Sequence, residues 1–128
     1  MTNQELIALA LKARAHAYAP YSRYAVGAAL LGKSGKVYTG CNVENAAYSL
    51  TICAERTAVS KAVSEGEREF EAIAVVTANG GTPCGPCRQV LAEFGPDIRV
   101  LVATPEGLVS MKTVSELLPD LFGAQDLP

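Results

Sequence analysis

The chain has 128 residues, a length that suits one domain, and its 11 basic and 13 acidic side chains give a net charge of −2. The basic residues are scattered rather than clustered in a stripe, so we expect no nucleic-acid partner. The sequence has no run of 18 apolar residues, and its N-terminus lacks a signal-peptide pattern, so we expect no membrane partner and a cytoplasmic location. In a reducing compartment the four cysteines stay unpaired, which leaves metal binding, redox chemistry or core packing for each thiol.

Hydrophobic spacing predicts helices alternating with strands along the whole chain. A capping box of Thr2 and Glu5 begins the first helix, which we expect to end near Ala17 because Pro20 follows. We expect strands over residues 24–31, 36–43, 70–78, 98–103 and 108–111, and further helices over residues 52–65, 85–94 and 113–118, with an irregular tail over 120–128. Thr51 is the expected N-cap of the second helix, and Gly66 its stop. This order favours a sheet covered by helices on both faces.

Three thiols and one carboxylate form the most informative set of side chains. Cys84 and Cys87 are spaced i, i+3 at the start of a helix, which places both sulfurs on one side, and Cys53 lies in the first turn of another helix. The positive ends of two helices favour the thiolates that a metal requires. Three protein ligands leave the fourth tetrahedral position of zinc open to water, as in a catalytic site. Glu55, two residues after Cys53, has a side chain long enough to reach such a water as an acid-base group; the alternative is a first-turn glutamate stabilised by the helix dipole.

The other candidate residues near the thiols have simpler alternatives. Zinc with three thiolates has a net charge of −1, and Arg56 and Arg88 are placed to donate hydrogen bonds to the sulfurs, although either is equally well an exposed arginine. Cys41 lacks metal-type spacing and is expected in the core. His16, the only histidine, is expected at the surface or at a helix end rather than in a site.

The combination Cys-Ala-Glu followed by Pro-Cys-x-x-Cys about 30 residues later is the general pattern of zinc deaminases, in which the glutamate is not a ligand. Over nearly its whole length the chain resembles the small homotetrameric cytidine deaminases. The segments that carry the resemblance are PYSRYAVGA at 20–28, TGCNVEN at 39–45, CAER at 53–56, PCGPCRQVL at 83–91, and LLP at 117–119 followed by Phe122.

The resemblance implies an α/β fold, a three-layer α/β/α sandwich with a five-stranded mixed sheet, and one domain over residues 1–128. It implies one Zn²⁺ per chain, held by Cys53, Cys84 and Cys87, and hydrolytic deamination of cytidine and deoxycytidine with Glu55 as proton shuttle. The implied substrate-binding residues are Asn42 and Glu44 at the ribose, the backbone of Ala54 and Cys84 at the base edge, Tyr24 on the pyrimidine, and Ala46, Tyr48 and Phe122 in an adjacent subunit's pocket.

Two departures from the family pattern bear on the pocket rim. Tyr24 stands where phenylalanine is common, which adds a hydroxyl that needs a partner or water. The loop 79–82 is shorter than usual before Pro83. The Glu44 carboxylate would repel a 3′ phosphodiester, which favours a free nucleoside over a polynucleotide.

Three alternatives remain open from the sequence. A related enzyme would deaminate another cytosine nucleoside, such as blasticidin S. A structural zinc module would have no activity but would normally supply a fourth protein ligand. A thiol-disulfide oxidoreductase would use Cys84 and Cys87 and leave Cys53 and Glu55 without a role.

Overall fold

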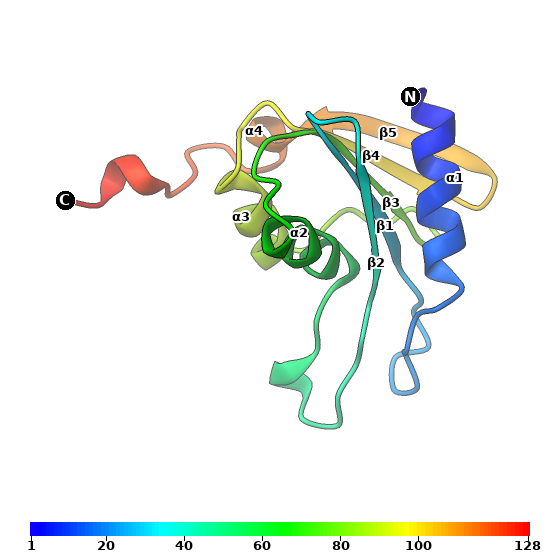
Figure 1. The fold of residues 1–128 in the computed structure, drawn as a ribbon. Helices are drawn as coiled ribbons and strands as arrows, with labels where there is room; N and C mark the ends of the chain where they lie inside the picture. Colours follow the sequence, from blue (N-terminus) through cyan, green and yellow to red (C-terminus); the bar gives the residue numbers. More distant parts are fainter.

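A computed structural model describes residues 1–128 and shows a five-stranded mixed sheet between helices (Figure 1). The strands are β1 (Gly27–Gly32), β2 (Val37–Cys41), β3 (Phe70–Val76), β4 (Arg99–Thr104) and β5 (Gly107–Thr113), and the helices are α1 (Asn3–Arg14), α2 (Ala54–Ser64), α3 (Gly85–Ala92) and α4 (Val114–Leu117). The strand order is β2-β1-β3-β4-β5; β3 and β4 are parallel and every other pair is antiparallel. The helix α1 covers one face, and α2 and α3 cover the other. The predicted three-layer α/β/α fold is thus confirmed.

Each face of the sheet carries its own hydrophobic cluster, because successive side chains of a strand point to opposite faces. On β3, Ile73 and Val75 belong to the cluster under α2 and α3, whereas Ala72 and Ala74 belong to the cluster under α1. A strand buried on both sides shows no polar alternation, which is why β1, and β3 from Ala72 onward, read as continuous apolar runs in the sequence.

Small residues let α2 lie close to the sheet. A Cβ added to Gly40 of β2 would lie 2.6 Å from the Ala54 carbonyl oxygen, so only glycine fits where the first turn of α2 crosses that strand. The face of α2 that lies on the sheet also has small side chains, since Ala54, Ala58 and Ala62 are fully buried there. This close contact fixes the N-terminus of α2 above the sheet.

Several element boundaries differ from the sequence prediction. The capping box of α1 is present, but the helix ends at Arg14 because its last amides bond to carbonyls three residues back, which tightens residues 15–17 into a turn. The N-cap of α2 is Cys53 rather than Thr51. The strand β1 begins only at Gly27, and β5 is longer than predicted. Two short 3₁₀ turns, Tyr48–Leu50 and Ala124–Asp126, were not predicted, and the second lies in the tail expected to be irregular.

Two of the simpler expectations have different outcomes. His16 is exposed just after α1, as predicted. Cys41 was predicted in the core, but it is only partly buried because β2 is an edge strand.

None of the helices is long and apolar enough to cross a membrane.

Candidate active site

Two helix N-termini bring the three predicted thiols together. Cys53 is the N-cap of α2, and Cys84 is the N-cap of α3. Cys87 lies in the first turn of α3 and is fully buried. An N-cap side chain lies beside the free N–H groups of the first turn, so both sulfurs occupy the positive end of a helix.

The spacing of the three sulfurs fits a tetrahedral metal ion. The Sγ atoms of Cys53 and Cys84 are 3.9 Å apart, those of Cys84 and Cys87 are 3.3 Å apart, and all three lie within 4.8 Å of one another. Zn–S bonds of about 2.3 Å at tetrahedral angles place sulfurs roughly 3.8 Å apart. The cluster therefore fits one zinc ion with three protein ligands, and no fourth histidine, cysteine or carboxylate ligand belongs to it.

The thiols affect the pKa values of one another. Hydrogen bonding from Cys87, together with Arg56, lowers the pKa of Cys53 to about 5. The same contact with Cys53, with burial, raises the pKa of the Cys87 thiol. A divalent cation binds all three sulfurs as thiolates, so metal binding here releases the protons that the thiols still hold.

Glu55 is a buried carboxyl group beside the sulfur cluster. It lies in the first turn of α2, is 5% exposed, and lines the same pocket as Cys53 and Cys84. Burial, with a smaller contribution from Cys53, raises the pKa of Glu55 to about 7. A carboxyl group with a pKa near neutrality both accepts and donates protons readily, which is what acid-base catalysis at neutral pH requires.

The two arginines predicted near the sulfurs have different roles. Arg56 donates from Nη2 to Cys53 Sγ at 3.7 Å and to the Thr51 carbonyl oxygen at 3.1 Å, so its positive charge lies against the cluster as expected. Arg88 does not contact a sulfur. It donates to the carbonyl oxygens of Pro83 and Leu117, because its side chain leaves α3 toward the loop before the helix and toward α4. Arg88 therefore holds the chain around the site rather than the metal ligands.

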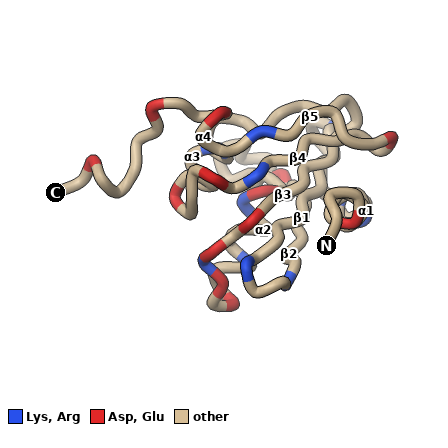
Figure 2. The backbone as a smooth tube through the Cα atoms, turned by 90° about the horizontal axis from the view of Figure 1, so that it is seen from above, with Lys and Arg blue, Asp and Glu red and all other residues tan.

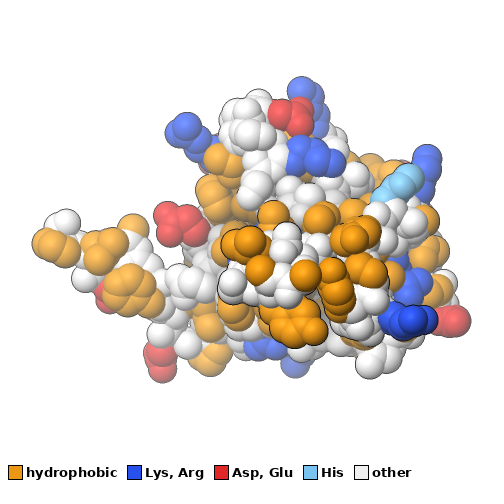
Figure 3. All heavy atoms as spheres, turned by 90° about the horizontal axis from the view of Figure 1, so that it is seen from below, with side chains coloured by type: hydrophobic (Ala, Val, Ile, Leu, Met, Phe, Trp, Pro, Cys, Tyr) orange, Lys and Arg blue, Asp and Glu red, His pale blue; other side chains and the backbone are white.

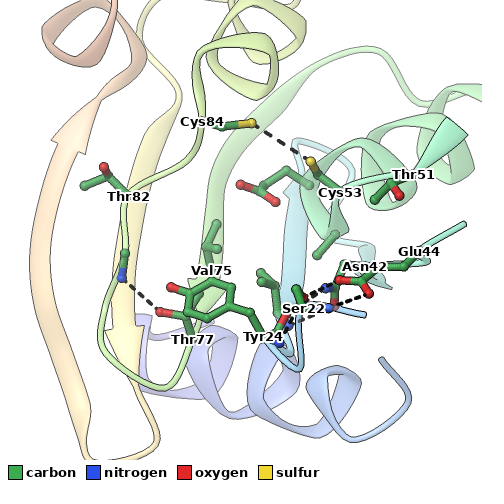
Figure 4. A pocket seen from close by; sticks show the side chains of 14 residues that line it. Ser22, Tyr24, Asn42, Glu44, Thr51, Cys53, Val75, Thr77, Thr82 and Cys84 are labelled. Atoms are coloured by element: carbon green, nitrogen blue, oxygen red, sulfur yellow. Dashed lines mark hydrogen bonds between the residues drawn. The ribbon is translucent and has the colours of Figure 1, made fainter. Parts of the chain in front are cut away.

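The other end of the pocket is built from loops, as Figure 4 shows with the sulfurs of Cys53 and Cys84 at one side and Ser22 and Tyr24 at the other. Asn42 is buried there and uses its side chain to hold the segment before β1. Its Oδ1 accepts the Val26 N–H at 2.9 Å, and its Nδ2 donates to the Tyr24 carbonyl oxygen at 2.8 Å. One N–H of the amide remains for a further partner.

Glu44 is held by three donors from one short segment. Its Oε1 accepts the backbone N–H groups of Tyr21 at 2.9 Å and Ser22 at 3.1 Å, and its Oε2 accepts the Ser22 hydroxyl. The hydrogen bond from the Ser22 hydroxyl lowers the pKa of the Glu44 carboxyl. Glu44 is thus an oriented, ionised acceptor at the wall of the pocket.

The pocket between these two ends has a volume of about 260 Å³, a size suited to a small molecule. Its 14 lining residues are Ser22, Tyr24, Val26, Asn42, Glu44, Thr51, Cys53, Ala54, Glu55, Val75, Thr77, Gly81, Thr82 and Cys84. The structure therefore gathers seven predicted site residues around one cavity: Tyr24, Asn42, Glu44, Cys53, Ala54, Glu55 and Cys84. Cys87 lies behind them at the sulfur cluster, and Arg56 behind Cys53.

Three predicted residues lie outside this cavity. Tyr48 is 75% exposed, and it packs edge-to-face on Tyr21 with ring centroids 6.1 Å apart. Phe122 is 58% exposed in the tail, where its carbonyl oxygen accepts a hydrogen bond from Gln89. Ala46 is exposed in the loop before the Tyr48–Leu50 turn. These positions leave all three accessible to another subunit.

Sequence reasoning assigned no role to Ser22, Thr77 or Gly81, although all three line the cavity. Ser22 did have a local signal, because a serine two residues before Tyr24 can form a turn. In the structure the Ser22 hydroxyl accepts the Tyr24 N–H at 3.0 Å. The position of Gly81 carried no such signal, because the Tyr24 hydroxyl group that lies against it comes from a distant part of the chain.

Comparison with known proteins gives one consistent result. The sequence model of the "Cytidine and deoxycytidylate deaminase zinc-binding region" matches residues 1–104. The chain belongs to this family. It is 52% identical to the cytidine deaminase of Sporosarcina psychrophila over 99% of this chain and 96% of that protein. It is 55% identical to the cytidine deaminase of Halalkalibacterium halodurans over 99% and 98% of the two chains.

Solved structures agree with the sequence comparison. The crystal structure of cytidine deaminase from Burkholderia pseudomallei has a TM-score of 0.91 and 50% identity, covering 95% of this chain and all of that chain. The cytidine deaminase of Mycobacterium tuberculosis has a TM-score of 0.83 and 43% identity, covering 96% and 99%. Membership of a zinc-binding deaminase family and the geometry of Cys53, Cys84 and Cys87 both support an enzyme with one zinc per chain.

Proposed function

We propose that this protein is a cytidine deaminase that converts cytidine and deoxycytidine to uridine and deoxyuridine with release of ammonia. The observation that carries the proposal is a buried carboxyl group, Glu55, beside three sulfurs spaced for zinc at one end of a cavity sized for a small molecule. Family membership supports the same reaction, because the two curated relatives named above are cytidine deaminases.

The residues of this chain account for the proton transfers of the reaction. Zinc bound by Cys53, Cys84 and Cys87 would lower the pKa of the attacking water. Glu55 takes a proton from that water and delivers it to N3 of the base as the oxygen adds to C4. Glu55 then transfers the second proton to the amino nitrogen, so that the C4–N bond breaks, ammonia leaves and the oxygen remains as the carbonyl of uridine. A carboxyl pKa near 7 suits both the acceptance and the donation.

At the recognition end, ribose hydroxyls would donate to the ionised Glu44 and accept from the free N–H of Asn42. Tyr24 would pack on the base, and the backbone of Ala54 and Cys84 would contact its edge. Lys and Arg are interspersed with Asp and Glu along the chain (Figure 2), and the cavity lining contains no lysine or arginine. A substrate phosphate would therefore find Glu44 and no cation to hold it, which favours a free nucleoside over a nucleotide or polynucleotide.

We further propose a homotetramer with sites shared between subunits. The face seen in Figure 3 gathers hydrophobic side chains, and the exposed apolar residues of segments 18–24 and 43–52 are Tyr18, Tyr21, Tyr24, Val43, Tyr48, Leu50 and Ile52. Bridges between Tyr18 and Val43 and between Val43 and Ile52 join these segments into one surface. Such a surface is typical of protein–protein interfaces. Ala46, Tyr48 and Phe122 would then complete the pocket of a neighbouring subunit.

We also propose a cytoplasmic location, with which the unpaired thiols agree.

The direct test is to quantify zinc in purified protein and to follow the absorbance change from cytidine to uridine, with the mass in solution measured by light scattering. We expect about one zinc per chain, turnover that a chelator abolishes and zinc restores, and a mass of four chains. Zinc without turnover of cytidine or deoxycytidine would contradict the proposal and favour another cytosine nucleoside or a structural zinc module. Protein that lacks zinc and forms a Cys84–Cys87 disulfide would favour the redox alternative.

A further inference from the structure

The hydroxyl group of Tyr24 has a partner in the loop that follows β3. It donates to Asn79 Oδ1 at 2.7 Å, across 55 residues of sequence. The same Oδ1 lies 3.4 Å from the Thr77 hydroxyl, and that hydroxyl accepts the Gly81 N–H at 2.9 Å. Tyr24, Thr77 and Gly81 all line the cavity. One chain of hydrogen bonds therefore joins the segment before β1 to the opposite cavity wall.

Gly81 leaves the space that the Tyr24 hydroxyl occupies. A Cβ built on Gly81 would lie 2.6 Å from Tyr24 Oη, closer than real Cβ contacts, but 3.8 Å from Cζ, which is ordinary contact. The Gly81 backbone is outside the left-handed region, so alanine is compatible with its conformation. The tyrosine hydroxyl group explains why position 81 is glycine. With phenylalanine at position 24, a glycine at position 81 would not be required.

The loop between β3 and α3 is held in two separate halves. Arg88 holds the half that adjoins the metal ligand, by donating to Thr82 Oγ1 at 3.1 Å and to the Pro83 carbonyl oxygen at 2.7 Å. The half that forms the cavity wall depends on Thr77, Asn79 and the Tyr24 hydroxyl. Loosening the second half leaves the anchor of the first half in place.

We propose that the Tyr24 hydroxyl, the Asn79 side chain and the vacant Cβ position of Gly81 form a clasp that positions the Tyr24 ring and the adjoining cavity wall for nucleoside binding. Asn79 and Gly81 are positioning residues, which act through Tyr24. The clasp rests on the proposed deaminase function, because its effect is on the KM for the nucleoside. It acts on KM rather than kcat because the sulfurs and Glu55 are held by α2, α3 and Arg88.

A double-mutant cycle tests the hydrogen bond. Tyr24→Phe and Asn79→Ala should each raise the KM for cytidine by about 3- to 10-fold, the effect of one hydrogen bond, with kcat within about twofold of wild type. The double variant should match the single variants, because both changes remove the same contact. The matched control is Tyr38→Phe, which removes another tyrosine hydroxyl bond, to Glu67 at 3.3 Å, away from the cavity. It should lower the melting temperature without changing KM.

A rescue experiment tests the packing. Gly81→Ala should raise KM by more than Tyr24→Phe does, because the new methyl group displaces the tyrosine ring. Adding Tyr24→Phe to Gly81→Ala should bring KM back to the level of Tyr24→Phe alone. Two outcomes would overturn the clasp. In one, the KM of the Tyr24→Phe/Asn79→Ala double variant rises by the product of the two single effects; in the other, Tyr24→Phe does not restore the KM of Gly81→Ala. Turnover by the wild type would still uphold the deaminase in either case. Absence of turnover in zinc-loaded wild type would overturn both.

Discussion

The two ends of the cavity are built on different principles. One end, which we call the closed end, contains the sulfur cluster and Glu55. There Cys87 and Glu55 are buried side chains in the first turns of helices that pack on the sheet. The other end, which we call the open end, contains Ser22, Tyr24 and Glu44, which lie in connecting segments. Ser22 donates hydrogen bonds to Glu44, and the Tyr24 hydroxyl donates one to Asn79. Rigid elements hold reacting groups most accurately, whereas loops carry recognition. Changes at the closed end should therefore alter kcat or metal content, and changes at the open end should alter KM.

The largest effect is expected at the closed end, from Glu55→Gln. The amide keeps the shape of the carboxyl group but cannot take a proton from water, so kcat should fall on the order of 100- to 10,000-fold. Zinc content should stay at one per chain, since the three sulfurs remain in place. Rate measurements and metal analysis on the same preparation check both expectations.

The matched control for this change is Glu65→Gln, which neutralises an exposed carboxylate just after the same helix. It should leave kcat and zinc content as in wild type. Near-normal kcat in Glu55→Gln would remove the proton shuttle from the mechanism and weaken the division between the two ends. Loss of zinc in that variant would assign the carboxyl group to the metal instead.

A smaller effect is expected from Arg56→Gln, which removes the positive charge that lies against Cys53. Partners that support metal ligands typically contribute 10- to 100-fold to metal affinity, so zinc affinity should fall by about that factor. Competition with a chromogenic chelator measures it. Arg88→Gln is the natural comparison, because that guanidinium bonds only carbonyl oxygens and the Thr82 hydroxyl. A loss in Arg88→Gln equal to that in Arg56→Gln would contradict the distinction between the two arginines.

The closed end was largely predictable from the sequence. The spacing of Cys84 and Cys87, a proline inside the helix start and a carboxylate two residues after Cys53 are local patterns, and local patterns report helix ends well. The alternation of helices and strands predicted the layered sheet in the same way. The local pattern did not predict the partners of Arg88. Both Arg56 and Arg88 donate to a carbonyl oxygen five residues back, and the distant Leu117 carbonyl oxygen is a partner of Arg88 alone.

The open end was less predictable because its contacts join distant segments. Ser22 meets Glu44 across 22 residues, and Tyr24 meets Asn79 across 55. Neither pairing has a periodic or spacing signature, so residues 24–26 read as the start of a strand. In the structure they form the wall of the cavity, tied to Asn42, and β1 begins only at Gly27. The hydrogen bonds from Asn42 override the local preference of this segment for a strand.

The smallest effect, and the sharpest test of the open end, is expected from Ser22→Ala. The Ser22 hydroxyl lowers the pKa of Glu44, so the carboxylate stays ionised to lower pH than an ordinary glutamate. Without the hydroxyl, the pKa of Glu44 rises toward its usual range, and protonation begins at a higher pH as the solution is acidified. The KM for cytidine should then rise by about 3- to 10-fold near neutral pH, because Glu44 loses one of its positioning bonds. On the acid side, KM should climb at a higher pH than in wild type, while kcat follows wild type at each pH.

Ser34→Ala provides a control with the same local geometry. Ser34 donates to Glu67 and accepts the Lys36 N–H at 3.2 Å, as Ser22 donates to Glu44 and accepts the Tyr24 N–H, but neither Ser34 nor Glu67 lines the cavity. KM and its pH profile should be unchanged in this variant. Profiles of KM that coincide for Ser22→Ala and wild type would show that the serine only shapes the turn. A shift confined to kcat would instead place Ser22 with the proton transfers of the closed end, and the separation of recognition from chemistry in this cavity would fail.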